Sequence, residues 1–215
     1  MLKKNIINFQ FGEVVNDFDI PVLNNREIRA AAGIMFISAF LALILILFKG
    51  NFIPVKYILC LFVLEFSIRL FINPKFAPFL IIGRIIVSKQ NPEYVGAAQK
   101  KFAWYIGFSI SVIMFLLLVV LNTYSPITGI ACLICLILMF FESSFGICLG
   151  CKIYNFIKKE KAQLCPGEIC DLKSKSEIQK VSLLQWVITV GLVSFIILLH
   201  HLFNDFFSII PYRLF

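Results

Sequence analysis

Long apolar runs without a charged side chain are the feature that most restricts how this chain can fold. Residues 30–48 and 102–121 contain no Asp, Glu, Lys or Arg, and residues 127–147 contain only Glu142. A helix of about 20 residues crosses the roughly 30 Å hydrocarbon core of a bilayer. The chain is 60% hydrophobic and 15% charged, whereas about a quarter of a soluble domain is charged. These runs predict an integral membrane protein that crosses the bilayer several times.

The segments that are long and apolar enough to be membrane spans are residues 30–48, 52–72, 102–121, 127–147 and 181–203. The second of them carries Lys56, Glu65 and Arg69. Residues 76–87 are also apolar, but about 12 residues are too few to cross a bilayer, so we expect a short interfacial or re-entrant helix there. The predicted fold class is all-α: a polytopic transmembrane helix bundle with four core spans, a fifth C-terminal span and this short helix.

The polar segments divide the chain into regions. These are a polar N-terminal arm (1–29), a four-span membrane core (30–151), a Cys- and Lys-rich link (152–180) and a C-terminal span with its tail (181–215). At the end of the arm, Asn25 followed by Glu27 is typical of a helix start, with a capping side chain and an acidic residue in the first turn.

Positive charge alternates between the connecting segments. Lys and Arg are frequent in the arm, after the second span and in the link, whereas the other connections and the tail hold only Lys49, Lys56 and Arg213. Because basic loops stay on the cytoplasmic side, we expect the N-terminus inside and the C-terminus outside. The net charge of +8 then reflects topology and contact with anionic lipid. No basic segment is interleaved with solvent-facing aromatics, so we expect no nucleic-acid partner.

Four of the seven cysteines fall at or beyond the predicted cytoplasmic end of the fourth span. Cys148 and Cys151 form a C-x-x-C pair, and Cys165 and Cys170 follow in the link. In a reducing compartment such cysteines are more often catalytic or metal-binding than a disulfide framework. Cys148 and Cys151 are therefore the candidate catalytic residues, because one thiolate can attack while the other resolves the mixed disulfide. The neighbouring Lys152 would favour a thiolate.

Two other interpretations of these cysteines stay open. The four thiolates could hold a structural zinc ion, the one cofactor that the sequence suggests, although the spacing of Cys165 and Cys170 is at the loose edge of that pattern. Alternatively, some are ordinary small apolar residues at a helix end. A further pair, Cys132 and Cys135, lies inside the fourth span, where buried cysteines usually act as small hydrophobes.

The ionisable residues inside the predicted spans suggest a buried site. Glu65 and Arg69 are four residues apart and can pair on one helical face. They could line a polar pocket with Glu142 beside the cysteines, or simply pair and snorkel near the interface. Cys132, Cys135 and Glu142 share one face of the fourth span, and Cys148 and Cys151 would lie on the other side if the helix continued straight. Direct relay between the two cysteine pairs would need a bend, which Gly146 could supply.

Three stretches of the chain carry a family resemblance. They are Asn-Arg-Glu-Ile-Arg at 25–29, Asn-Pro-Lys-Phe-Ala-Pro at 73–78, and the segment from Glu142 through Gly146 to Cys148 and Cys151. Together they resemble a bacterial family, the domain of unknown function 4395 family. The resemblance covers roughly residues 10–155, with the fifth span outside it.

The resemblance implies a site and a cellular setting. Matched position by position, it implies that Glu142, Gly146, Cys148 and Cys151 form the functional cluster. Family members often occur near thioredoxin-like and rhodanese-like proteins, which implies thiol or sulfur handling with a soluble partner of that kind. It also implies the bacterial inner membrane.

We expect thiol–disulfide or sulfane-sulfur chemistry at a cytoplasm-facing C-x-x-C. A quinone-coupled disulfide oxidoreductase is disfavoured, because such enzymes work on the outer side of the membrane whereas Cys148 and Cys151 are predicted on the inner side. The alternatives are a transporter of a small sulfur-containing solute, which Cys132 and Cys135 would favour, and a non-enzymatic membrane scaffold with a structural zinc site.

Overall fold

The computed structural model describes residues 11–13, 20–158, 170–171 and 181–214. The helices are α1 (Asn25–Lys49), α2 (Ile53–Ser67), α3 (Pro78–Ile86), α4 (Ala97–Phe115), α5 (Pro126–Phe140), α6 (Leu149–Lys158) and α7 (Leu183–Ser208). Wider, π-type turns extend three of them without a break: η1 (Ile68–Ile72) after α2, η3 (Leu116–Val120) after α4 and η4 (Phe141–Phe145) after α5. A short 3-10 turn, η2 (Pro74–Phe76), precedes α3.

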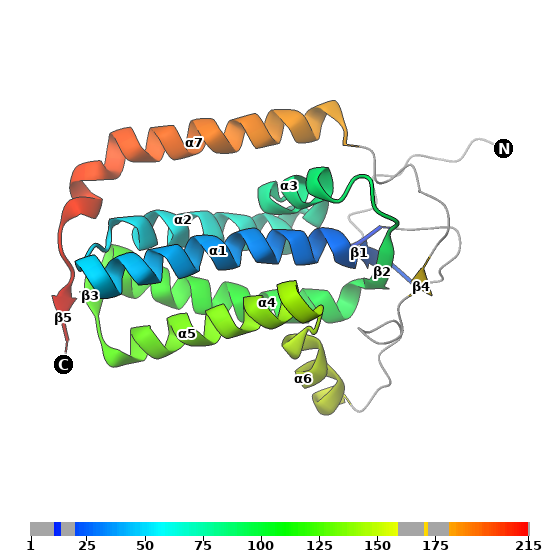
Figure 1. The fold of residues 1–215 in the computed structure, drawn as a ribbon, viewed down its shortest axis with the longest axis horizontal. Coiled ribbons are helices and arrows are strands. Elements are labelled where there is room, and N and C mark those ends of the chain that lie inside the picture. Colours follow the sequence, from blue (N-terminus) through cyan, green and yellow to red (C-terminus); the bar gives the residue numbers. More distant parts are fainter. Residues whose placement is uncertain (1–10, 14–19, 159–169, 172–180, 215) are drawn as a thin grey trace.

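The long helices lie side by side as an all-α bundle (Figure 1). Four helical stretches of the described chain are long and apolar enough to cross a membrane: Asn25–Lys49, Ala97–Val120, Pro126–Phe145 and Leu183–Ser208. The remaining predicted span is α2 with η1, which carries Lys56, Glu65 and Arg69, all buried inside the bundle. The short apolar segment is α3. The predicted fold class, a polytopic helix bundle, is confirmed.

Two predicted helix starts are wrong by a few residues. The capping residue of α1 is Asn24, not Asn25: its Oδ1 accepts the backbone N–H of Arg26 at 3.1 Å. Helix α4 begins at Ala97, before the predicted start at 102, and so includes Lys100. The sequence criterion excluded that residue because it is charged, but its ammonium group has a partner in the folded bundle.

Short strands, which the sequence patterns did not reveal, join the ends of the helices. Strands β1 (Val22–Asn24), β2 (Glu93–Gly96) and β4 (Cys170–Asp171) form an antiparallel sheet in the order β1-β2-β4, with Leu23 opposite Val95. At the other end of the bundle, β3 (Thr123–Tyr124) pairs in parallel with β5 (Tyr212–Arg213) (Figure 1). The first sheet ties the arm to the link at the end where α6 lies.

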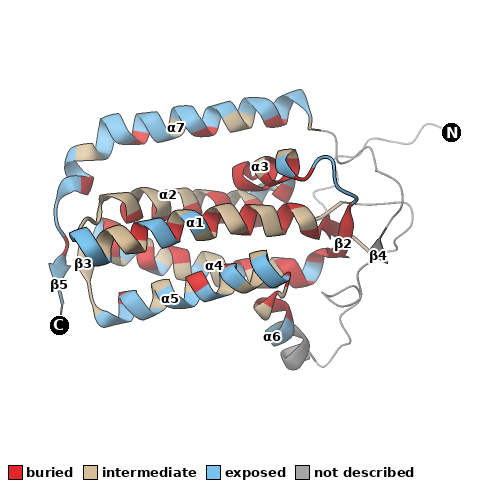
Figure 2. Ribbon diagram, viewed as in Figure 1, coloured by how far each residue is buried: buried red, intermediate tan, exposed pale blue. Residues whose placement is uncertain are grey.

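The C-terminal helix is attached to the bundle mainly at its two ends. Near its start, Gln185 Nε2 donates to the carbonyl of Lys75 at 3.1 Å. After its end, the carbonyl of Ile209 accepts from Nζ of Lys56 at 2.7 Å, and the same ammonium donates to Asn122 Oδ1 at 2.7 Å. Between these points most of α7 is exposed (Figure 2). Its exposed side chains are largely apolar, so lipid is the solvent that suits this helix.

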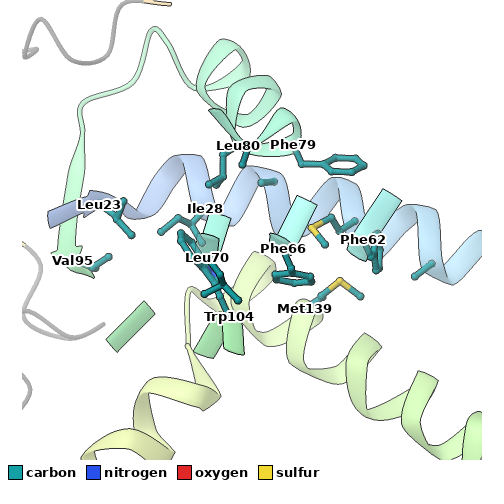
Figure 3. Close-up of a cluster of buried hydrophobic side chains, with 14 of the residues drawn as sticks. Leu23, Ile28, Phe62, Phe66, Leu70, Phe79, Leu80, Val95, Trp104 and Met139 are labelled. Atoms are coloured by element: carbon teal, nitrogen blue, oxygen red, sulfur yellow. The ribbon is translucent and has the colours of Figure 1, made fainter. Parts of the chain in front are cut away.

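The main hydrophobic core lies between α1, α2, α4 and α5. Figure 3 shows Phe66 and Leu70 from the second span, Trp104 from α4 and Met139 from α5 in this cluster. Leu23 and Val95 extend it to the first sheet. The core therefore ends at the same end of the bundle as the predicted cysteine site.

Candidate active site

A sharp turn between η4 and α6 positions the C-x-x-C pair. Gly146 has a positive φ of 67° and ends the last turn of the span. Arg29 from α1 caps that turn, with Nε donating to the carbonyl of Ser143 at 3.4 Å and Nη2 to that of Ser144 at 3.2 Å. A side chain at position 146 would meet the Arg29 guanidinium at 3.3 Å. The predicted bend at Gly146 is confirmed, and α6 leaves the bundle in a new direction (Figure 1).

Cys148 sits at the N-terminus of α6. Its Sγ accepts the backbone N–H of Cys151 at 3.3 Å, in the way that a capping side chain does. The thiols of the pair are both buried, with Cys148 2% and Cys151 1% exposed. Because the first N–H groups of a helix favour a negative charge, this position stabilises a thiolate.

A buried ion pair lies beside the two thiols. Lys100 from α4 is 1% exposed, and its Nζ pairs with Glu142 from η4. The positive charge of Lys100 acts to lower the pKa of both cysteine thiols. Lys152, which we expected to favour the thiolate, is exposed on α6. The sequence patterns gave Lys100 no role. The one indication was its position just before the uncharged segment 102–121, where a charged side chain needs a partner inside the bundle.

The environment separates the acidities of the two thiols. The pKa of Cys148 is lowered, chiefly by the hydrogen bond from the Cys151 thiol and further by the charge of Lys100 and the Cys151 backbone N–H, against burial and the Glu142 carboxylate. The pKa of Cys151 is raised, because its thiol donates to Cys148, is buried and faces the Cys148 charge. The surroundings thus favour the thiolate form of Cys148 and the protonated form of Cys151.

A cavity of about 220 Å³ opens next to Cys148. It lies between α1, α2, α4, α5 and α6, and its wall is mainly aliphatic and aromatic. The groups in the wall that can carry charge or thiol chemistry are Arg69, Cys135, Glu142 and Cys148. Cys151 is not part of the wall. Of the two thiols in the C-x-x-C pair, a molecule in the cavity would therefore contact that of Cys148.

Glu65 holds Arg69 in place from behind the cavity. Its Oε1 accepts from Nε and Nη2 of Arg69 at 2.8 and 2.6 Å, and its Oε2 accepts the backbone N–H of Phe79 at 3.0 Å. The predicted Glu65–Arg69 pair is confirmed. The expected pocket contains Arg69 and Glu142, but Glu65 does not line it, because its carboxylate is already used by these three donors.

Aromatic rings fix the Arg69 guanidinium from the other side. Its Cζ lies 5.1 Å from the ring centroid of Trp104 and 5.3 Å from that of Phe66. Such contacts stabilise a cation in an apolar environment. A rigidly held positive charge therefore faces the same cavity as the Cys148 thiol.

Two further pairs of cysteines were singled out in the sequence: Cys132 with Cys135, inside the fourth span, and Cys165 with Cys170, in the link. Cys135 lines the cavity beside Cys148, and Cys132 shares a smaller neighbouring cavity of about 30 Å³ with Cys135. Within the described part of the chain, no three His, Cys, Asp or Glu side chains are placed to hold a metal ion. Cys165 lies outside the described residues, and only the backbone of Cys170 is described, so the four-thiolate zinc site stays a prediction.

Comparison with known proteins gives one match. The model of the family described as "Domain of unknown function (DUF4395)" matches residues 23–159. No curated protein and no solved structure matches the chain. The matched region runs from β1 to the end of α6, so it contains the whole site, and the C-terminal span lies outside it, as predicted. This chain belongs to the DUF4395 family.

Proposed function

We propose that this protein is a membrane thiol protein in which Cys148 and Cys151 exchange electrons, or a sulfur atom, with a sulfur-containing partner. The observation that carries the proposal is the geometry of Cys148: its Sγ caps α6 through the Cys151 N–H at 3.3 Å, and Lys100 stands beside it. A thiolate, not a thiol, is the attacking species in disulfide exchange. This arrangement produces one thiolate and keeps its partner protonated.

The exchange proceeds in two steps. Cys148 Sγ attacks a disulfide of the partner, so that one S–S bond breaks, a mixed disulfide forms and a partner thiolate leaves. Cys151 then gives up its proton and attacks Cys148 Sγ, forming the internal disulfide and releasing the second partner thiolate. Two electrons pass from the dithiol to the partner. With a persulfide partner, Cys148 accepts the outer sulfur and Cys151 releases it as hydrogen sulfide, again leaving the internal disulfide.

A thioredoxin-like or rhodanese-like soluble partner must reach thiols that are buried in this structure. Helix α6 covers them and packs closely against α4, where Gly150 meets Ala103. A movement of α6 away from α4 is the simplest way to expose Cys148. We therefore expect the soluble partner to engage α6 rather than the apolar cavity.

The proposed location is the bacterial inner membrane, with the thiol end facing the cytoplasm. The elements at that end carry most of the described basic residues, among them Arg26, Arg29, Lys75, Lys89 and Lys152. The opposite end has few, such as Lys49 and Arg213. This asymmetry follows the rule that basic segments stay inside.

Transport of a small sulfur-containing solute is the second candidate function. The observation that favours it is the succession of thiols, since Cys135 lines both the main cavity and the smaller one that it shares with Cys132. Uptake of sulfide or thiosulfate into proteoliposomes would separate it from the first proposal. A zinc-stapled scaffold would instead retain bound metal through purification, which native mass spectrometry detects.

The decisive test traps the first intermediate. Reduced protein is treated with glutathione disulfide and analysed by mass spectrometry of the intact chain and its peptides. We expect Cys151→Ser to accumulate glutathione on Cys148, because the resolving thiol is missing, while the wild type forms the Cys148–Cys151 disulfide. Cys60→Ser is the matched control, because Cys60 lies on α2 and lines neither cavity, and it should behave like the wild type.

Two results would contradict the proposal. Glutathione distributed evenly over the cysteines of the Cys151→Ser variant would mean that Cys148 has no special reactivity. An oxidised wild type without the Cys148–Cys151 linkage would remove the resolving role of Cys151. For the sulfur-transfer version, the same variants are incubated with a persulfide, and a mass gain of one sulfur atom on Cys148 is expected in Cys151→Ser.

A further inference from the structure

We propose that the cavity beside Cys148 binds the head group of a membrane quinone, which reoxidises the Cys148–Cys151 dithiol. This inference rests on the proposed function and names its second substrate. The sequence disfavoured quinone coupling because the pair is predicted at the inner end of the bundle. The structure changes that argument, because the cavity wall is mainly apolar and includes Ile134, an exposed residue of the membrane-spanning helix α5.

The mouth of the cavity lies on the apolar outer surface of the bundle. Ile134 from α5 and Ile153 from α6 both line the cavity, and both are exposed, at 46% and 45%. Ile106, Ile110 and Leu138 continue the wall inward from α4 and α5. An occupant that enters past these side chains comes from the lipid phase, and a lipid-soluble ring with an isoprenoid tail satisfies that requirement.

The inner part of the cavity suits a flat ring with carbonyl oxygens. Trp104 and Phe66 supply aromatic surface against which a ring can stack. Arg69 supplies the donor for a carbonyl. Its Nε and Nη2 donate to Glu65 and to Met35 Sδ, and a guanidinium has five N–H donors. An apolar wall with few, fixed polar groups is the usual design of a cofactor site.

The chemistry at this site balances. The Cys148 thiolate adds to a ring carbon of the quinone and forms a C–S bond. Cys151 releases its proton and attacks Cys148 Sγ, so that the S–S bond forms, the C–S bond breaks and its electron pair stays on the ring. The hydroquinone takes up two protons, one from Cys151 and one equivalent to the proton that Cys148 lost. The sum is dithiol plus quinone giving disulfide plus hydroquinone.

The position of the two thiols matches this order of events. Cys148 lines the cavity whereas Cys151 does not, so of these two thiols Cys148 is the one that contacts a bound ring. The backbone N–H of Cys151 lies 3.3 Å from Cys148 Sγ, which keeps the resolving residue next to the sulfur that it attacks. The ring and the resolving thiol therefore approach Cys148 from different sides.

The experiment uses the reduced full-length protein in lipid nanodiscs with decylubiquinone as the probe. Quinone reduction is followed by absorbance and thiol loss by mass spectrometry. We expect saturable reduction, with one quinone consumed for each Cys148–Cys151 disulfide formed. Ile134→Trp narrows the mouth and should slow this reduction about tenfold. Ile137→Trp is the matched control: it lies on the same helix, is 43% exposed and does not line the cavity, so its rate should equal that of the wild type.

Oxidation of the same samples by glutathione disulfide separates the two proposals. If glutathione disulfide forms the Cys148–Cys151 disulfide and decylubiquinone does not, the quinone site is overturned and the thiol function stands. If neither oxidant forms that disulfide, the thiol function itself fails. Equal slowing by Ile134→Trp and Ile137→Trp, or undiminished quinone reduction in Cys148→Ser, also overturns the quinone site.

Discussion

At the scale of single residues, Lys100 and Glu142 act on Cys148 in opposite directions. The ammonium group of Lys100 lowers the pKa of Cys148 and the carboxylate of Glu142 raises it. Because the two groups also pair with each other inside the protein, neither charge is left alone at the site. Together with the hydrogen bond from the Cys151 thiol and with burial, the balance between these charges sets the fraction of Cys148 that is thiolate at a given pH.

Removing either charge should shift the pH dependence of Cys148 alkylation. Glu142→Gln removes the negative charge, so the pKa of Cys148 falls and its reaction with iodoacetamide begins at lower pH. Lys100→Met removes the positive charge, so the pKa rises and the profile moves to higher pH. We expect shifts of about one pH unit or more. The measurement is the alkylation rate of the Cys148 peptide between about pH 5 and 10, the range that brackets ordinary and lowered thiol pKa values.

Lys152→Met is the matched control for this pH profile. Lys152 adjoins Cys151 in the sequence but is exposed, and water screens an exposed charge. Its removal should leave the profile of Cys148 unchanged. A shift with Lys152→Met and none with Lys100→Met would show that the neighbouring residue in the chain, and not the buried one, controls the thiol.

At the scale of structural elements, the contact between α6 and α4 decides whether the thiols are reachable. A Cβ at Gly150 would lie 2.6 Å from Cβ of Ala103, closer than two non-bonded carbon atoms can approach. The absence of a side chain at Gly150 therefore allows α6 to lie directly on α4. This contact keeps Cys148 and Cys151 buried.

Gly150→Leu should displace α6 and expose Cys148. We expect faster alkylation of Cys148 at a pH where it is fully ionised, together with a destabilisation of about 1–3 kcal/mol, as for other overpacked contacts. Thermal unfolding and the alkylation rate measure the two effects. Gly191→Leu, at a position on α7 with open space around it, is the control and should change neither. An unchanged rate in Gly150→Leu would mean that α6 does not limit access.

In the molecule as a whole, the thiol site lies at one end of the helix bundle. The described chain enters the bundle at β1 and leaves it at β5, at the opposite end (Figure 1). The arm and the link meet at the end where α6 lies, since β1 and β4 both pair with β2. The thiol site is thus at the same end of the bundle as the most basic segments, which the proposed orientation puts on the cytoplasmic side.

Reporter fusions test this orientation. Alkaline phosphatase is active only outside the cytoplasm, so a fusion after Phe215 should be active and one after Lys158 inactive. Green fluorescent protein at the same positions should give the reverse pattern. An active phosphatase at Lys158 would put the Cys148 end outside and would remove the cytoplasmic thioredoxin-like or rhodanese-like partner from the proposal.

The helices of this protein follow from its amino-acid sequence. In lipid, every backbone N–H and C=O must be satisfied within the chain, so an uncharged run such as residues 30–48 has one stable local structure. The Glu65–Arg69 pair and the bend at Gly146 were also predictable, because both depend on residues only a few positions apart. For the same reason the C-x-x-C pair can be recognised from the sequence alone.

The groups that surround those thiols come from distant parts of the chain, so they follow from the tertiary structure alone. Lys100 and Glu142 are far apart in the chain, and they meet because α4 packs against α5 and α6. Likewise Arg69 reaches the cavity because Glu65, Phe66 and Trp104 fix it there. A periodic pattern shows that a helix is apolar but not which neighbour each of its faces meets. Helix packing makes that choice, and with it the charge and the cavity at Cys148.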